Sequence, residues 1–142
     1  MLVSILEQSV SVEGKPQSVT IQDSINLAIK AEKLGYKRFW VSEHHNHPTI
    51  IGTAPEILMA AIACNTSSIR IGSAGIMLPH YSPLKVAEQF RVLEAIAPNR
   101  IDLGLGRAPG SDGRTALALN PNSRSDSEHF PSHVRDLIAW VS

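Results

Sequence analysis

Residues 69–106, IRIGSAGIMLPHYSPLKVAEQFRVLEAIAPNRIDLGLG, contain one strand–helix–strand unit that decides the fold class. The runs at 69–77 and 100–105 are short and apolar, as expected of buried strands. Between them a helical pattern opens at Ser82-Pro83 and stops at Pro98. This stretch therefore predicts a βαβ unit, in which the two strands are parallel.

The same unit repeats toward the N-terminus. Strands are predicted at residues 2–6 and 38–41, and helices over residues 20–34 and 53–64. Strand starts recur about every 30–35 residues, which suits successive βαβ units. Right-handed crossovers would place the four strands side by side in chain order. Their apolar character suggests that both faces of each strand are covered, which leaves a doubly wound sheet and a barrel both open.

Cap signals set the expected helix boundaries. Thr20 is predicted as an N-cap and Gly35 as the residue that ends the same helix. The stretch 53–56, TAPE, is predicted to be a capping box. Cys64 is interpreted as a small core residue, because free cysteine is among the most buried residue types.

The amino-acid composition of the chain limits the classes of partner that it could bind. The chain has 142 residues, 43% of them apolar, and 13 basic and 13 acidic side chains. A balanced charge gives no indication of nucleic acid or an anionic membrane surface as a partner. The N-terminus has no basic region followed by a long apolar run, and no stretch approaches the ~20 apolar residues of a membrane span. A cytoplasmic protein is expected.

Unusual side chains follow three of the predicted strands, where sites of parallel α/β folds lie. Residues 42–47, SEHHNH, bring three histidines and a carboxylate together, which favours proton transfer over purely local hydrogen bonding. The small residues 72–75 are compatible with close approach by a ligand or by another backbone, and equally with ordinary barrel packing, in which small residues fill crowded layers. Arg107 lies in a glycine-rich loop and could bind phosphate or be solvated. Pro109 breaks the dinucleotide-binding spacing.

Four motifs in order resemble the bacterial-luciferase-like flavin-dependent monooxygenases. They are WVSEHH at 40–45, RIGSAGIMLP at 70–79, AEQF at 87–90 and NRIDLGLGR at 99–107. The likeness runs from about residue 2 to about residue 121. It implies a (β/α)₈ TIM barrel that uses reduced FMN and O₂ to oxidise a small organic substrate, with a flavin reductase supplying the reduced FMN.

The resemblance also implies roles for individual residues. His44 matches the histidine that assists proton transfer near the flavin. Ala74 and Gly75 match a small pair, joined by a cis peptide, beside the flavin ring. Gly106 and Arg107 complete the expected cofactor-binding set, in which Arg107 binds the FMN phosphate. No metal is expected.

A complete barrel takes ~250 residues, so about four strands correspond to an N-terminal half barrel. Residues 1–121 are expected to form this half and residues 122–142 a polar loop and a truncated helix. The inner face of this half is expected to carry apolar side chains, such as Phe39, Val41, Ile71 and Ile101, that would pack against the other half of the barrel. With two open sheet edges as well, a homo-oligomer is expected.

Two other readings stay open. The pair His45 and His47 has the His-x-His form of some zinc hydrolases, although no convincing further ligand follows the third or fourth strand. The chain could also be a catalytically inactive fragment of the family.

Overall fold

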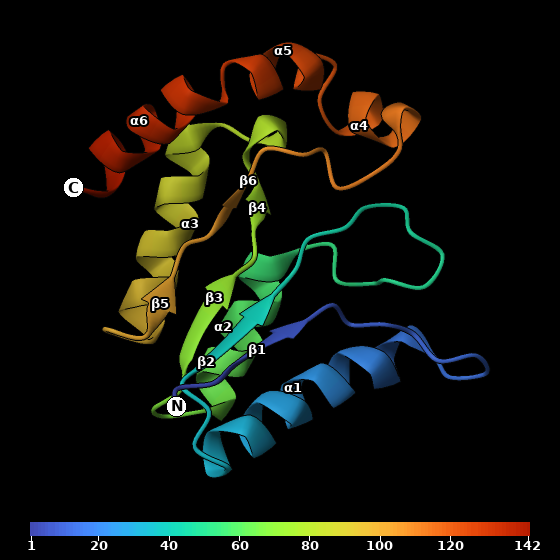
Figure 1. The fold of residues 1–142 in the computed structure, drawn as a ribbon, viewed down its shortest axis with the longest axis vertical. Helices are drawn as coiled ribbons and strands as arrows, with labels where there is room; N and C mark the ends of the chain where they lie inside the picture. The colour runs from blue at the N-terminus through green and yellow to red at the C-terminus, as the bar shows by residue number, and fades with distance from the viewer.

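The computed structural model describes all residues from 1 to 142. Strands β1 (Ser4–Glu7), β2 (Arg38–Val41), β3 (Arg70–Ser73) and β5 (Ile101–Asp102) form one sheet in the order β1-β2-β3-β5. All three neighbouring pairs are parallel (Figure 1). The predicted order of four parallel strands is therefore confirmed.

The predicted third and fourth strands are each interrupted. Beyond β3 and β5 the chain forms β4 (Ile76–Met77) and β6 (Leu105–Gly106), which pair in parallel as a separate two-stranded sheet. The short 3₁₀ helix η1 (Leu78–His80) follows β4 directly. Figure 1 shows that β4 and β6 continue the direction of β3 and β5, so all these segments lead to one end of the molecule.

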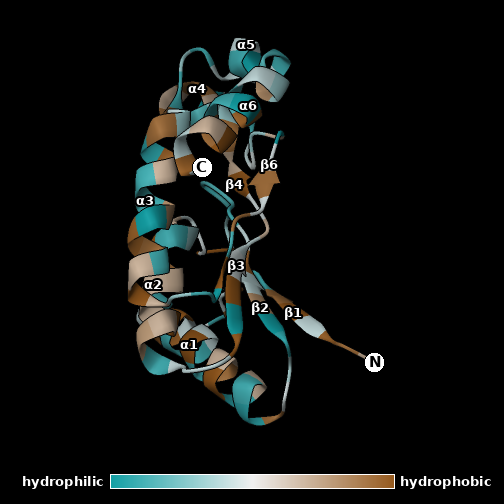
Figure 2. Cartoon of the chain, turned by 90° about the vertical axis from the view of Figure 1, so that its left-hand side faces the viewer, coloured by the Kyte–Doolittle hydropathy of each residue, from teal (hydrophilic) through white to brown (hydrophobic).

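Helices α1 (Gln17–Lys33), α2 (Pro55–Asn65) and α3 (Pro83–Ile96) cover one face of the sheet. Figure 2 shows these three helices on one side of the strands and no helix on the other side. None of the helices has the length and hydropathy that a membrane span requires.

The predicted N-cap of the first helix and the predicted capping box of the second helix were wrong, whereas proline does lie at the start of the second helix as expected. Helix α1 begins at Gln17 after Pro16, and Thr20 is buried inside it, where its carbonyl accepts a hydrogen bond from the Ser24 hydroxyl. Helix α2 begins at Pro55, and no side chain caps it. Proline fixes the backbone angle that a first helical turn needs, and this substitutes for the expected capping box. Gly35 does follow α1 with φ of 82°, as predicted.

The C-terminal segment contains the helix that was expected at its end, but helices also replace the polar loop that was expected before it. It contains α4 (Gly113–Leu119), α5 (Ser123–Glu128) and α6 (Phe130–Val141). Asn120 explains how the polar stretch is held, because its side-chain amide donates to the Pro79 carbonyl and to Asp126. Helix α6 packs against α3 and places Leu137 in the core. These tertiary contacts are invisible in a local sequence pattern.

The core lies between the sheet and the helices, which corrects the expectation that apolar side chains line the open inner face. Phe39, Val41 and Ile71 are buried on the helix side of the sheet, and Ile101, which pairs with Ile71, packs against the same core. The side chains of β2 alternate between buried and half-buried, because successive residues point to opposite faces. Arg38 and Trp40 therefore face the open side, so the strands are not apolar on both faces. Cys64 is exposed, so its assignment to the core was also wrong.

Candidate active site

The three segments singled out in the sequence meet at the carboxyl edge of the sheet. Val41, at the end of β2, lies beside Ser73 at the end of β3. Met77 in β4 pairs with Gly106 in β6. The backbone N–H of His45 donates to the Gly110 carbonyl at 3.0 Å, which joins the histidine segment to the glycine-rich loop. Parallel strands in register bring these segments to one edge.

Glu43 is the buried polar centre of this edge. Its side chain has 0% exposure, and the Tyr81 hydroxyl donates to its Oε1 at 2.7 Å. The Met77 N–H donates to its Oε2 at 2.9 Å, and His45 Nε2 lies 2.6 Å from Oε1. Burial, and then the hydrogen bond to Glu43, raise the pKa of Tyr81. Glu43 thus ties β2 to β4 and to the turn before α3.

The three histidines of residues 44–47 have different surroundings. His44 is half-buried, its Nδ1 lies 3.3 Å from the Ser42 hydroxyl, and its Nε2 makes no hydrogen bond within the chain. His45 is paired with Glu43, as described above. His47 is exposed, and its Nδ1 accepts from the backbone of Thr49 and Ile50. The histidines of the proposed His-x-His pair therefore have separate partners, and no cluster of three His, Cys, Asp or Glu side chains could hold a metal ion.

The small residues of the third and fourth strands allow two backbones to approach each other. A Cβ on Gly75 would lie 2.7 Å from the Leu105 carbonyl carbon, and one on Gly106 would lie 2.7 Å from Met77 Sδ. A Cβ on Gly104 would have even less space, because it would overlap the Ser73 carbonyl oxygen. These contacts show that the two backbones approach each other closely at this stretch. The peptide bond between Ala74 and Gly75 is cis.

Arg107 follows β6 and is exposed. Its Nε donates to the Ser127 carbonyl at 2.9 Å, and its two terminal nitrogens make no hydrogen bond within the chain. The backbone N–H groups of Ala108, Gly110 and Ser111 also donate no hydrogen bond. No hydrogen bond joins Arg107 to His44. The loop thus offers a guanidinium and several amide donors at the same edge as His44.

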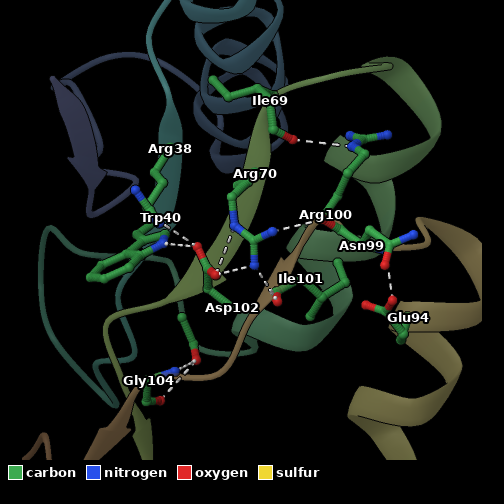
Figure 3. Close-up of polar contacts among 11 residues, drawn as sticks. Arg38, Trp40, Ile69, Arg70, Glu94, Asn99, Arg100, Ile101, Asp102 and Gly104 are labelled. Atoms are coloured by element: carbon green, nitrogen blue, oxygen red, sulfur yellow. Dashed lines mark hydrogen bonds and ion pairs between the residues drawn. The ribbon is translucent and has the colours of Figure 1, made fainter. Parts of the chain in front are cut away.

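A second polar cluster, not expected from the sequence, lies on the open face near the amino ends of the strands (Figure 3). Asp102 accepts from Arg70 Nε at 3.0 Å, and from Arg38 Nε and Trp40 Nε1 at 3.1 Å each. Burial would raise the pKa of Asp102, but these hydrogen bonds and the two arginine charges hold it below its ordinary value. An open hollow of about 570 Å³ lies over this face.

Sequence reasoning missed this cluster and the contacts of Glu43. The signal for the cluster was the period-two alternation in Arg38-Phe39-Trp40 and Arg70-Ile71-Gly72, which marks one polar face. The signal for Glu43 was a carboxylate placed directly after a buried strand, where only hydrogen-bonded or paired charges are tolerated.

The parallel sheet, covered by helices on one face, is the architecture of an N-terminal half of a (β/α)₈ barrel, and the candidate residues lie at the carboxyl ends of its strands. The chain belongs to the luciferase-like monooxygenase family, whose model matches residues 1–127. It is 46% identical over 139 residues to the N-acetyl-S-alkylcysteine monooxygenase of Bacillus subtilis strain 168, covering 98% of this chain and 42% of that protein.

Two solved structures show the same fold. The crystal structure of apo-MsnO8 superposes with a TM-score of 0.92 at 45% identity, covering 99% of this chain and 42% of that one. The oxygenating constituent of 3,6-diketocamphane monooxygenase from the CAM plasmid of Pseudomonas putida, a type II Baeyer-Villiger monooxygenase solved in complex with FMN, gives 0.85 at 22% identity. This match covers 96% of this chain and 38% of that one. The chain thus spans about two fifths of the length of these relatives.

Proposed function

We propose that this chain supplies the flavin-binding carboxyl edge of an FMN-dependent monooxygenase that oxidises a small organic substrate with O₂. The observation that carries the proposal is the meeting of the His44 segment, the Ala74–Gly75 pair and the Arg107 loop at one edge. The family membership, and an FMN complex among proteins of the same fold, support it.

The residues present fit the phosphate group of FMN. Phosphate is recognised by guanidinium forks and by loops with several free backbone N–H groups. The Arg107 terminal nitrogens and the Gly110 and Ser111 amides are such donors, and none is used within the chain. Gly106, next to Arg107, pairs with Met77 in β4, and a side chain there would require the end of the Met77 side chain to move.

Reduced FMN, when bound, supplies the electrons that activate O₂. Arg107 would bind and orient its phosphate, and Ala74 and Gly75 would lie beside its ring. His44 would hold or move a proton at Nε2, the ring nitrogen left free by its contact to Ser42. Glu43 keeps the histidine segment in place through the contacts described above.

The remaining partners belong to the same proposal. A flavin reductase would deliver reduced FMN, the site of action would be the cytoplasm, and the chain would act as a homo-oligomer. The open edges of β1 and β5, each paired on one side only, are the basis for the oligomer.

Two substitutions test the proposed roles of Arg107 in FMN binding and of His44 in proton transfer. Arg107→Ala should weaken FMN binding by about 1.5–3 kcal/mol, the usual range for a hydrogen bond to a charged group. His44→Ala should leave FMN affinity nearly unchanged and slow substrate oxidation in the presence of a flavin reductase. Fluorescence titration of FMN and the rate of O₂ consumption would measure these effects.

Arg114→Ala is the matched control, because Arg114 is an exposed arginine on α4 in the same region. It should change neither quantity. Equal losses of FMN affinity in the His44 and Arg107 variants would contradict the division of roles. An Arg107 variant that binds FMN as tightly as the Arg114 variant would contradict the phosphate site.

A further inference from the structure

His80 is a buried side chain for which the proposed reaction has no use. It is the last residue of η1 and has 9% exposure. Its Nε2 lies 2.6 Å from the Pro109 carbonyl oxygen, and its Nδ1 is buried without a hydrogen-bond partner. Its only hydrogen bond therefore goes to the loop that follows Arg107.

The proton position on His80 follows from this partner. A carbonyl oxygen only accepts hydrogen bonds, so Nε2 must carry a proton and donate. The ring is packed edge-on against His45, with centroids 5.6 Å apart, and against Tyr81, with centroids 6.3 Å apart. These contacts fix the ring plane and thus the direction in which Nε2 donates.

The hydrogen bond to the Pro109 carbonyl also fixes the direction of the Gly110 N–H, because the peptide between these two residues is trans. The C=O of one residue and the N–H of the next point in opposite directions across a planar trans peptide. The only cis bond of the chain joins Ala74 and Gly75, so the peptides after Pro109 and Gly110 are trans. With the Pro109 carbonyl held toward His80, the Gly110 N–H points away from it. The Gly110 carbonyl is likewise held by the His45 N–H, which turns the Ser111 N–H outward.

We propose that His80 is a positioning residue that orients the Gly110 amide, beside Arg107, as a donor to an anionic group. The two groups that hold the loop carbonyls come from different segments, His80 from η1 and His45 from the segment after β2. Together they fix two successive peptides and leave two successive N–H groups free, which is an arrangement that binds phosphate oxygens. The identity of the anion as the FMN phosphate rests on the proposed function; the orientation of the loop does not.

Two substitutions of His80 distinguish the roles of its two ring nitrogens. Glutamine places an amide N–H at the position of Nε2, whereas asparagine places one at the position of Nδ1. If donation to Pro109 holds the loop, His80→Gln should behave like the wild type and His80→Asn should not. A role for the ring as packing alone would make both variants equally defective.

Amide hydrogen exchange of the 142-residue chain provides a readout that needs no flavin. The His45 N–H reports closure of the loop, because it donates to Gly110. Its exchange should be about tenfold faster in His80→Asn, equivalent to about 1.4 kcal/mol, and unchanged in His80→Gln. The Ala74 N–H, which donates to Val41, is the internal control. An unchanged ratio of His45 to Ala74 exchange in His80→Asn, or an equal rise in both variants, would overturn the inference.

Comparing the affinities for FMN and for riboflavin, which lacks the phosphate, tests whether the anionic group is the FMN phosphate. The preference for FMN over riboflavin should fall about tenfold in His80→Asn and be restored in His80→Gln. If Arg107→Ala abolishes the preference and His80→Asn does not, the positioning role is wrong and the proposed function stands. If the wild type shows no preference, the proposed function fails, and the exchange data alone decide the role of His80.

Discussion

At the scale of single residues, Glu43 is the side chain on which the carboxyl edge most depends. It accepts from Tyr81 and Met77 and contacts His45 while fully buried. Glu43→Gln puts an amide donor where only acceptors fit, so it should lower the free energy of unfolding by about 2 kcal/mol. Urea denaturation would measure this. Glu88→Gln, at an exposed pair with Lys85, is the control and should stay within about 0.5 kcal/mol.

Gly104 offers a second test at this scale. A Cβ at Gly104 would overlap the Ser73 carbonyl oxygen, whereas a Cβ at Gly113 meets nothing within 4 Å. Gly104→Ala should therefore destabilise the fold by about 1–3 kcal/mol, the cost typical of overpacking. Gly113→Ala, in the first turn of α4, should be neutral or slightly stabilising. Similar thermal midpoints for both variants would show that the close approach of the two strands is not required.

Individual residues were only partly predictable from the sequence. The motifs placed His44, Ala74, Gly75, Gly106 and Arg107 after strands, and the backbone brings all of these segments to one edge. The partners of Glu43 were not predictable, because Tyr81 is 38 residues away from it and no local pattern joins the two. The tether from His80 to Pro109 was missed for the same reason.

At the scale of elements, Glu32 holds the end of α1 against the segment that enters β3. Its Oε1 accepts from the backbone N–H groups of residues 67–69 and from the Ser68 hydroxyl. Burial would raise the pKa of Glu32, but these hydrogen bonds lower it from 4.5 to about 2. Four donors on one carboxylate oxygen thus link a helix to a strand.

This link predicts an acid-dependent loss of stability. A pKa lowered by folding stabilises the fold above pH 4.5 and loses that contribution as the pH falls toward about 2. Glu32→Gln should therefore be less stable than the wild type at pH 7, by roughly 1 kcal/mol after solvent screening, and the difference should vanish near pH 2. Urea midpoints at pH 7, 5 and 3 would measure it. A difference that is constant across this range would contradict the assignment.

The elements themselves were predicted better than their ends. Four parallel strands in chain order followed from the spacing of apolar runs, and three helices followed from apolar periodicity. The interruptions between β3 and β4 and between β5 and β6 were not foreseen, because they arise where two glycine-bearing backbones meet. Helix α5 was not foreseen because Asn120 and η1 stabilise a polar sequence that resembles a loop.

At the scale of the whole molecule, the sheet is covered on one face and open on the other. The open face carries Asp102 and its two arginines rather than an apolar layer. Exposed apolar side chains are Leu6, which pairs in register with Trp40 on the open face, Leu2 before β1, and Ile57 on α2. The unpaired edges of β1 and β5 and these side chains favour association.

The chain should therefore form a larger assembly at micromolar concentration rather than a 15.4 kDa monomer. Sedimentation velocity would measure this. Association through sheet edges should weaken when Leu6→Lys places a charge on the edge strand. A monodisperse monomer with a cooperative thermal transition would contradict the prediction.

Equilibrium dialysis of the purified chain against FMN tests the central claim most directly. The claim is that this half of a luciferase-like barrel contains the phosphate-binding edge of the flavin site. The prediction is saturable binding that approaches one FMN per chain, with affinity reduced about tenfold or more by Arg107→Ala and unaffected by Arg114→Ala. Absence of saturable binding, or equal binding by the Arg107 and Arg114 variants, would contradict it.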